Sequence, residues 1–415
     1  MSATPKNIVV VGGGIIGATT AFYLADHPDV SSATITVIEA SVHGAAQGAS
    51  GKAGGLVAKW AYPKALTAIS FPEHVKLAER FDGTKRWGWR WVGTGEWEGR
   101  GIKASAQRVK PGAGPTTSLG KKGGIPAPTH GVAAAGQAKG LPEDLTWVSD
   151  ELTDTYTPMA SPGDTAQVHP YLFTTSMLDL AVARGVRFLQ GRVFSLDVAS
   201  GQVQGVRYAK TGDTEELHLP ADYIVLAAGA WSPALLPSLP VSGTRAHSVV
   251  IRAPPSLPAH AVSPYVLFTS ITLPAAGRGR PRTVTPEIYP RPDSTIYVCG
   301  PGDHRVPLPP TVDDVSVDPH ACEEIWQWVA ETGIIQDWAL GDIEQRQACY
   351  LPVVDGDGGP IVGEVPAIKG LIVATGHTCW GICNAPGTAK AVSELIFKGN
   401  IECADLTGLD PAKFL

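Results

Sequence analysis

One glycine-rich run constrains the fold more than any other feature of this 415-residue chain: Gly12-Gly13-Gly14-Ile15-Ile16-Gly17. It follows a short apolar stretch, Asn7–Val11, and leads into Ile15–Ala25, whose apolar residues have helical spacing. A strand, a glycine turn and a helix in this order are typical of a dinucleotide-binding unit. The first glycine makes the turn, the second admits a pyrophosphate, and the third lets the helix pack on the strand. Free amides and the dipole at the helix N-terminus then favour the negative pyrophosphate.

An acidic residue completes this unit. A β-branched run, Thr34–Ile38, ends at Glu39, which lies 22 residues beyond Gly17. A carboxylate in this place accepts hydrogen bonds from ribose hydroxyls and repels a 2′-phosphate. The motif and the acid together predict a dinucleotide without a 2′-phosphate, but they do not distinguish FAD from NAD. A glycine turn that binds no ligand is the alternative.

The rest of the pattern predicts an α/β fold with Rossmann-type pieces scattered along the chain. Fully apolar runs at 223–228 and 370–375 are typical of parallel strands that are buried on both faces. Short β-like runs separated by Pro and Gly fill residues 241–310 and indicate an antiparallel sheet. Further helices are predicted at 71–82, 173–183, 318–332 and 387–398, and further strands at 186–189, 193–198 and 202–208.

We therefore expect two interleaved domains. The Rossmann-type, cofactor-binding domain is assigned to residues 1–80, 160–240 and 355–415, and a β-rich substrate domain to 81–159 and 241–354. Residues 99–140 have almost no large apolar side chains, so they are predicted to form a flexible surface insertion. Four tryptophans are expected mainly to pack in the interior: Trp87, Trp89, Trp91 and Trp97.

Charge and composition exclude several classes of function. The net charge is −6 and no basic stripe occurs, which argues against nucleic-acid binding. No apolar run is long enough to span a membrane and no signal peptide is found, so we expect a cytoplasmic protein. The six cysteines all lie in the last third and are interpreted as free thiols. The acid pairs Asp313-Asp314 and Glu323-Glu324 are interpreted as solvated, and no metal site is predicted.

Three later segments give the chain a specific resemblance. They are Gly48–Gly55, dense in small residues; Tyr223–Pro233, which reads YIVLAAGAWSP; and Gly370–Ile382, which reads GLIVATGHTCWGI. In this order they resemble the D-amino-acid oxidase/glycine oxidase/sarcosine oxidase family of flavoproteins. Through Ser50–Gly55 and Cys349–Pro352 the chain is most similar to fungal members of the Tda3 type. The resemblance covers most of the chain outside residues 99–140 and implies that FAD is the cofactor.

The resemblance also implies which residues bind FAD. The N-terminal members would surround the adenosine and the pyrophosphate, and Gly376–Ile382 would line the pyrimidine end of the flavin. The implied set is Gly12, Gly14, Ile15, Ile16, Glu39, Ala40, Ser50, Gly51, Lys52, Gly54, Gly55, Leu56, Val193, Ala228, Gly229, Trp231, Gly376, His377, Trp380, Gly381 and Ile382. We expect non-covalent FAD, with Cys349 as the candidate residue if the attachment is covalent.

The substrate side departs from the family pattern. Members of the glycine oxidase type place a carboxylate-binding Arg where this chain has Leu351, and the sarcosine oxidase type uses a Lys near the stretch Ile382–Asn384. Both anchors are missing, and the remaining cations are expected to be structural: Arg346, Arg291 and Lys52. The candidate substrate contacts are Trp60, Tyr350 and His377, and no catalytic residue is assigned.

The resemblance implies oxidation of the C–N bond of an amine or amino-acid derivative. Hydride would pass to the flavin, O₂ would be the acceptor, and hydrogen peroxide would be released. Two alternatives stay open. One is a dehydrogenase that uses another acceptor, and the other is a flavin-bound trafficking or binding protein that has lost the substrate anchors. In either enzyme reading the partner is a small-molecule substrate.

Overall fold

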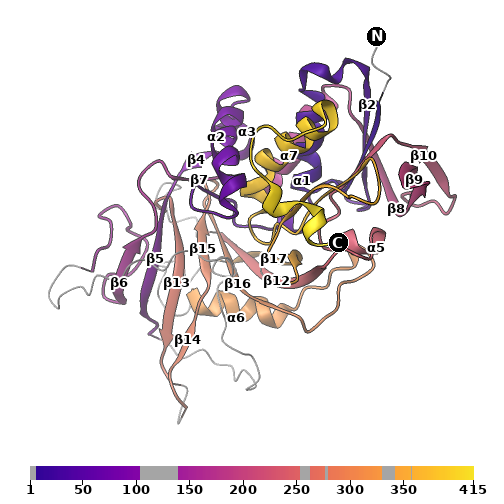
Figure 1. Cartoon of the computed structure of the whole chain (residues 1–415). Helices are drawn as coiled ribbons and strands as arrows, with labels where there is room; N and C mark the ends of the chain where they lie inside the picture. The colour runs from indigo at the N-terminus through magenta and orange to yellow at the C-terminus, as the bar shows by residue number, and fades with distance from the viewer. Residues whose placement is uncertain (1–5, 103–138, 253–261, 276–278, 330–341, 357) are drawn as a thin grey trace.

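The structure, a computed structural model, describes residues 6–102, 139–252, 262–275, 279–329, 342–356 and 358–415. Its strands form two large sheets and one small sheet. In Figure 1 the helices α1, α2 and α7 group at one end of the molecule, while α6 lies along the second large sheet at the other end. The predicted α/β class, with Rossmann-type and β-rich parts interleaved, is confirmed.

The first large sheet has the parallel centre that the sequence predicts. Strands β8, β2, β1, β11 and β19 pair in parallel, while β9, β10 and β18 add antiparallel edges. In sheet order the strands are β10 (Leu217–Pro220), β9 (Gln202–Lys210), β8 (Arg187–Ala199), β2 (Ala33–Glu39), β1 (Lys6–Val11), β11 (Tyr223–Leu226), β19 (Leu371–Thr375) and β18 (Ile361–Glu364). Every residue of β19 is buried, as a strand covered on both faces requires.

Strand β8 corrects one prediction. The sequence suggests two strands, 186–189 and 193–198, but the structure has one strand, Arg187–Ala199. Its first part pairs in parallel with β2 and its second part pairs antiparallel with β9. An irregularity between Val193 and Ser195 accompanies the change of partner. The sequence predicts two strands here because the hydrophobic pattern changes where the single strand changes its partner.

Two helices pack on this sheet, α1 (Ile15–Ala25) and α7 (Gly381–Lys398), and two more pack on these helices, α2 (Lys64–Arg80) and α4 (Pro170–Val182). α1 packs against α4 and α7, and α2 packs against α7. α2 begins seven residues before the predicted start at residue 71, because the Thr67 amide donates to the carbonyl of Pro63 and begins the helix there. The short helices are α3 (Gly83–Trp87) and α5 (Ser232–Leu235).

Helix α7 begins six residues before the predicted start at Gly387. Pro386 lies inside α7 and lacks an amide hydrogen, so it cannot donate to the carbonyl of Ile382 one turn earlier. The side chains of α2 supply the missing partners. His74 Nε2 lies 3.0 Å from the Ile382 oxygen, and Ser70 Oγ accepts from the Gly387 amide at 2.8 Å. The helix therefore continues through Pro386, whereas the sequence predicts that it begins just after this proline.

The second large sheet is mostly antiparallel. Its path is β17 (Ile343–Val354), β12 (Val241–Arg252), β16 (Thr295–Asp303), β15 (Glu287–Pro290), β13 (Tyr265–Leu273), β5 (Gly93–Arg100) and β6 (Thr153–Pro158), with β14 (Arg282–Val284) paired to β13. One pairing, β5 with β13, is parallel. α6 (Pro319–Val329) packs on β12, β16 and β17. Residues 330–341 lie outside the described part, so the predicted end of this helix at 332 stays untested.

The small sheet and the tryptophans join the two parts of the molecule. The small sheet has the order β3 (Leu56–Ala58), β7 (Thr165–Gln167) and β4 (Arg90–Trp91). Trp87 and Trp97 are fully buried and Trp89 nearly so, as predicted, but Trp91 is 48% exposed. Of the predicted insertion, residues 103–138 lie outside the described part, whereas Gly99 and Arg100 belong to β5. Among the described helices, none is both long and apolar enough to cross a membrane.

Candidate functional site

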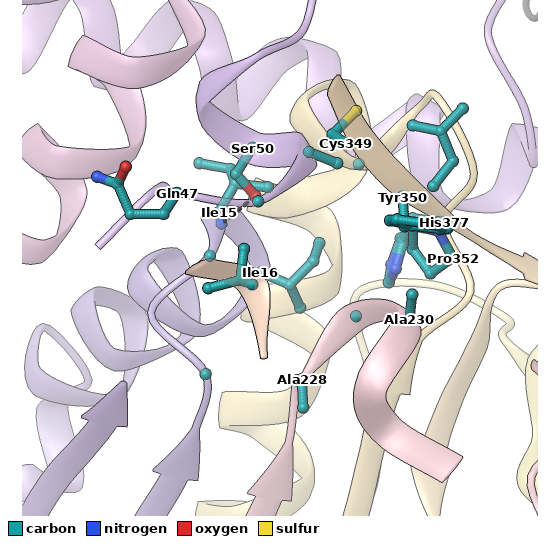
Figure 2. Close-up of a pocket in the computed structure, with 18 of the residues that line it drawn as sticks. Ile15, Ile16, Gln47, Ser50, Ala228, Ala230, Cys349, Tyr350, Pro352 and His377 are labelled. Atoms are coloured by element: carbon teal, nitrogen blue, oxygen red, sulfur yellow. Dashed lines mark hydrogen bonds between the residues drawn. The ribbon is translucent and has the colours of Figure 1, made fainter. Parts of the chain in front are cut away.

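A long cavity lies between the two large sheets. On one side it is lined by the carboxyl ends of β1, β2, β11 and β19, and on the other by residues of β13, β15, β16 and β17. Figure 2 shows Ile15, Ile16 and Ser50 on one side of this cavity and Cys349, Pro352 and His377 on another. Ligands of open α/β sheets bind at the carboxyl ends of the parallel strands, so the cavity lies where a cofactor is expected.

The glycine turn brings bare backbone to the cavity. Gly12 has a φ of +111°, and a Cβ there would lie 2.5 Å from the carbonyl oxygen of Ala227. A Cβ at Gly17 would lie 1.9 Å from the carbonyl oxygen of Gly12, so α1 can approach the turn only because this residue is glycine. Gly14 is the N-cap of α1 and provides no side chain to cap it. Apart from the Ile15 amide, which donates to Ser50 Oγ, the helix N-terminus can therefore face an anionic ligand.

Glu39 is tied to the turn. Its Oε2 accepts from the Gly13 amide at 2.6 Å, and its Oε1 accepts from the Ser41 amide at 2.7 Å. The side chain is 9% exposed, and burial raises the pKa of the carboxyl above its usual value. Each carboxylate oxygen has two acceptor sites. Because Glu39 and Ala40 both line the cavity, the remaining sites suit the hydroxyls of a ribose.

The segment Ala49–Leu56 is held between α1 and the second large sheet. Ser50 Oγ accepts from the Ile15 amide at 2.9 Å. From the second large sheet, the Tyr297 hydroxyl donates to the Lys52 carbonyl at 2.9 Å. A Cβ at Gly54 would lie 2.6 Å from the ring of Tyr289, so this contact also requires glycine. Ser50, Lys52, Gly54, Gly55 and Leu56 line the cavity. Gly51 does not, because it packs against the Ala46 carbonyl.

The three cations that could replace the missing anchors are engaged elsewhere. Lys52 Nζ donates to the Ala348 carbonyl at 3.1 Å, and burial lowers the pKa of this amine. Arg291 is buried and donates to the Ala53 carbonyl at 3.1 Å. Arg346 is half-exposed and its Nη2 lies 3.8 Å from Glu323. The expected structural roles of Lys52 and Arg291 agree with these bonds, and Arg346 lies outside the cavity lining.

The adenosine side is closed by two segments. Val193, Ala228, Gly229 and Trp231 line the cavity, as the resemblance implies. Residues 310–312 also line it, and the sequence prediction missed them. Next to them Asp313 accepts from Ser41 Oγ at 2.6 Å and from the Val42 amide at 2.9 Å. Its interpretation as a merely solvated acid is therefore wrong, because it holds the loop after β2.

The opposite end is formed by the N-terminus of α7. Trp380 is its N-cap, and Trp380, Gly381, Ile382 and His377 line the cavity. The end of β17 is bound to this turn, since the Thr378 amide donates to the Pro352 carbonyl at 2.9 Å. Gly376 does not line the cavity; its φ of +79° turns the chain beside Val354. The dipole of α7 favours negative charge at this end of the cavity.

His377 is a neutral imidazole. It is 3% exposed, and its Nε2 lies 3.0 Å from Thr388 Oγ1. Burial lowers the pKa of the imidazole to about 3. His377 can therefore hydrogen-bond to a ligand as a neutral group, but it does not supply a positive charge near neutral pH.

The other two candidate substrate contacts differ in position. Tyr350 lines the cavity, but its hydroxyl lies 2.9 Å from the Pro307 carbonyl, which occupies its donor. Trp60 does not line the cavity. It packs behind the lining, with its ring 5.3 Å from that of Trp380 and 6.0 Å from that of Phe268. The role of Trp60 as a substrate contact stays a prediction.

Cys349 and Leu351 line the cavity from β17. Burial raises the pKa of the Cys349 thiol to about 11, so near neutral pH it is protonated and a poor nucleophile. This agrees with non-covalent cofactor binding. Leu351 brings an apolar group to the place where the resemblance leads one to expect an arginine. Among the described residues, no group of three or more His, Cys, Asp or Glu side chains could hold a metal ion.

Besides Ala246 on β12, the sequence prediction does not include five lining residues of the second large sheet. They occupy alternate positions on neighbouring strands, as one face of a sheet requires: Phe268 on β13, Glu287 and Tyr289 on β15, and Tyr297 and Cys299 on β16. Glu287 pairs with Phe268 on one side and with Cys299 on the other. The sequence signal for this face is an acid, Glu287, within an otherwise apolar β run. Only the strand register shows that this face lines the cavity.

The cavity fits a dinucleotide with a large ring. It runs from Glu39 and Val193, past the N-terminus of α1, to His377 and the N-terminus of α7. One helix N-terminus suits a pyrophosphate and the other suits a ring that becomes anionic when reduced. Glycines at 12, 14 and 54 keep side chains out of the path between them.

Comparisons with known proteins agree with this geometry. The model of a family described as FAD dependent oxidoreductase matches residues 7–395. The TDA3 oxidoreductase of Saccharomyces cerevisiae is 30% identical, over 98% of this chain and 94% of its own length. The C1F5.03c oxidoreductase of Schizosaccharomyces pombe is 33% identical, over 98% of both chains. A D-amino acid dehydrogenase of Rhizobium rhizogenes is 28% identical over 57% of this chain and 51% of its own.

A solved structure shares the fold. Iminodiacetate oxidase from Chelativorans sp. BNC1 superimposes with a TM-score of 0.68 and 20% identity, covering 97% of this chain and 98% of the oxidase. The match of the family model over nearly the whole chain shows the family directly. The chain is an FAD-dependent enzyme and belongs to the DAO family of FAD dependent oxidoreductases.

Proposed function

We propose that the protein oxidises the C–N bond of an amine or amino-acid derivative and passes the electrons to O₂, producing hydrogen peroxide. The observation that carries the proposal is the lining at the flavin end of the cavity. There the N-terminus of α7 meets a face of the second large sheet that bears Phe268, Tyr289 and Tyr297. Such a face excludes water and presents apolar surface to a substrate carbon.

The reaction needs little from the protein beyond positioning. When bound, FAD supplies a ring that accepts a hydride from the substrate carbon and later gives two electrons to O₂. The neutral amine then becomes an imine, and water converts it to a carbonyl compound and a free amine. Near neutral pH the imidazole of His377 is uncharged and the Cys349 thiol is protonated, so neither adds a charge to the cavity.

The test is a substrate screen on the purified yellow protein. Primary amines, secondary amines and amino acids are added without oxygen, and bleaching of the flavin absorbance is followed. We expect at least one amine to bleach the flavin and, in air, to yield one hydrogen peroxide per substrate oxidised. If neither amines nor amino acids bleach the flavin, C–N oxidation is wrong.

The similarity to a D-amino acid dehydrogenase favours a second candidate, a dehydrogenase on the same fold. The same screen separates the two. A dehydrogenase would be bleached by its substrate and would reduce an added quinone or dye, but it would reoxidise slowly in air without forming peroxide.

A further inference from the structure

We propose that Glu287 is the substrate anchor and that it binds a cationic amino group, so that this enzyme selects amines with a second, positively charged group. The proposal rests on the proposed function only in taking the substrate to be an amine. The charge of this anchor is opposite to that of a carboxylate-binding arginine.

Glu287 is placed for this role by the sheet register. It lies on β15 with its side chain 5% exposed, yet it lines the cavity. Its strand neighbours on the same face are Phe268 and Cys299, which also line the cavity. Cys379, in the turn before α7, interacts electrostatically with Glu287, which places the carboxylate near the flavin end.

Two neutral donors contact the carboxylate. Its Oε2 accepts from the Tyr289 hydroxyl at 2.6 Å and lies 3.7 Å from Cys299 Sγ. Burial, with a further contribution from the Glu287 charge, raises the pKa of the Tyr289 hydroxyl and of the Cys299 thiol well above their usual values. Both groups are therefore protonated donors. A buried carboxylate is stabilised far more by a cation than by neutral donors, so a cationic ligand gains strongly here.

The aromatic lining adds to the preference. Phe268 and Tyr289 pack edge to face with their ring centroids 6.4 Å apart, and Trp380 lines the same cavity. Ring faces attract ammonium groups, most strongly where water is excluded. The Lys52 ammonium also lines the cavity, but it is bound to the Ala348 carbonyl and interacts with Cys349 and Asp313.

The anchored cation is distinct from the reacting nitrogen. Hydride leaves a carbon whose nitrogen carries a free electron pair, so the reacting amine must be neutral. The group that Glu287 binds stays cationic throughout the reaction, either as a protonated amine or as a quaternary ammonium group. The substrate class is therefore a diamine, or an amine with a quaternary ammonium group, rather than a simple amino acid.

Binding tests the anchor without turnover. The holoprotein is titrated with butyltrimethylammonium and with hexanoate, and the shift of the oxidised flavin spectrum gives each Kd. We expect the cation to bind at least about tenfold more tightly than the anion. In Glu287→Gln the preference should fall by roughly tenfold, whereas the exposed Glu79→Gln should leave it unchanged.

Turnover separates this proposal from the proposed function. The three substrates are 1,4-diaminobutane, its mono-N-acetyl derivative and 4-aminobutanoate, which differ only in the charge of the far end. The diamine should reduce the flavin fastest and 4-aminobutanoate slowest. If no amine reduces the flavin but the cation preference depends on Glu287, the anchor stands and amine oxidation fails. Equal or tighter binding of hexanoate by the wild-type holoprotein overturns the anchor, whether or not Glu287→Gln folds.

Discussion

At the adenosine end of the cavity, the Glu39 side chain holds two backbone amides at once. The Gly13 amide belongs to the glycine turn and the Ser41 amide to the loop after β2, so the two oxygens tie the ends of β1 and β2 together. The carboxylate thus shapes the turn in addition to facing a ribose. Because Glu39 is buried, the loss of either oxygen leaves a backbone amide without its acceptor.

Glu39→Gln tests that role. The amide presents an NH₂ group where a second oxygen accepts from a backbone amide, so one donor is left facing another. We expect a loss of about 1–3 kcal/mol in the free energy of unfolding and weaker FAD binding. Urea unfolding of the apoprotein and quenching of FAD fluorescence measure the two effects. Glu79→Gln on the exposed face of α2 is the control, and an equal loss there would contradict the argument.

At this scale the sequence predicts the cofactor side far better than the substrate side. The roles of Gly12, Gly17 and Glu39 follow from a continuous motif whose geometry is local. The role of Glu287 depends on which strands neighbour β15 and on which face of the sheet meets the cavity. Neither is encoded within a few residues of Glu287, so its position in the cavity could be found only from the register.

At the scale of elements, side chains of α2 supply the hydrogen-bond partners that α7 lacks because of Pro386. His74 Nε2 serves the carbonyls of Ile382 and Cys383, at 3.0 and 3.2 Å, so this nitrogen carries the hydrogen. The other ring nitrogen, Nδ1, is buried and has no hydrogen-bond partner. Burial lowers the pKa of His74 to about 4. The first turn of α7, which lines the cavity, therefore depends on a neutral histidine in another helix.

This arrangement makes stability depend on pH. The unfolded chain protonates His74 as the pH falls through about 6.5, whereas the folded chain does so only near pH 4. The unfolded state thus binds more protons in this window, and the free energy of unfolding decreases as the pH falls. The contribution of His74 is on the order of 3 kcal/mol, fully lost below about pH 4.

His74→Gln is the matching experiment. It keeps a donor for the two carbonyls and should reduce the slope of unfolding free energy against pH between about 6.5 and 4. Chemical denaturation at several pH values measures this slope. His320→Gln, at an exposed site on α6, should leave the slope unchanged. An unaltered slope in His74→Gln would show that other groups govern the acid sensitivity.

Gly17→Ala tests the contact between α1 and the turn. The added Cβ would lie 1.9 Å from the Gly12 carbonyl oxygen, so α1 must move away from the turn. We expect a loss of about 1–3 kcal/mol in stability and a severe loss of FAD binding. Gly408→Ala is the control, because a Cβ there meets nothing within 4 Å, and its effect should stay within about 0.5 kcal/mol. Equal effects of the two substitutions on FAD retention would contradict this account.

Helices and strands can be predicted from the sequence where their hydrophobic periodicity is strong and they do not depend on one particular distant contact. Strands β1, β2, β11 and β19 follow from apolar runs, and α1 follows from its spacing. The start of α7 could not be predicted, since it requires His74 and Ser70, more than 300 residues away along the chain. The single strand β8 was likewise hidden, because its two halves serve different partners.

At the scale of the whole molecule, the cavity is shared by both large sheets. A cofactor in this cavity would contact the ends of the parallel strands and the face of the second large sheet together. Ligands that bind only the folded state raise stability by mass action, by about 2.7 kcal/mol at a concentration one hundred times Kd. FAD should therefore stabilise both sheets rather than the Rossmann-type part alone.

Hydrogen exchange with and without FAD measures this effect. Amides of β1 and β11 and amides of β13 and β16 should gain protection together when FAD is added. Riboflavin, which lacks the pyrophosphate and the adenosine, should give a smaller gain. Protection confined to the first large sheet would mean that the second large sheet does not share the cofactor.

The sequence predicts the interleaving of the two parts because the Rossmann-type segments are separated by a β-rich stretch. The boundaries between domains stay predictions. What the strand order adds is that the first large sheet takes strands from 6–39, 187–226 and 361–375.

This order has a consequence for synthesis. The glycine turn at residues 12–17 is synthesised long before β19 and the N-terminus of α7, which follow only at residues 371–382. Until they emerge, the cavity lacks one wall and FAD has only part of its binding surface. We therefore expect cofactor loading to come late in synthesis, and growing chains to expose apolar surface that a chaperone can recognise.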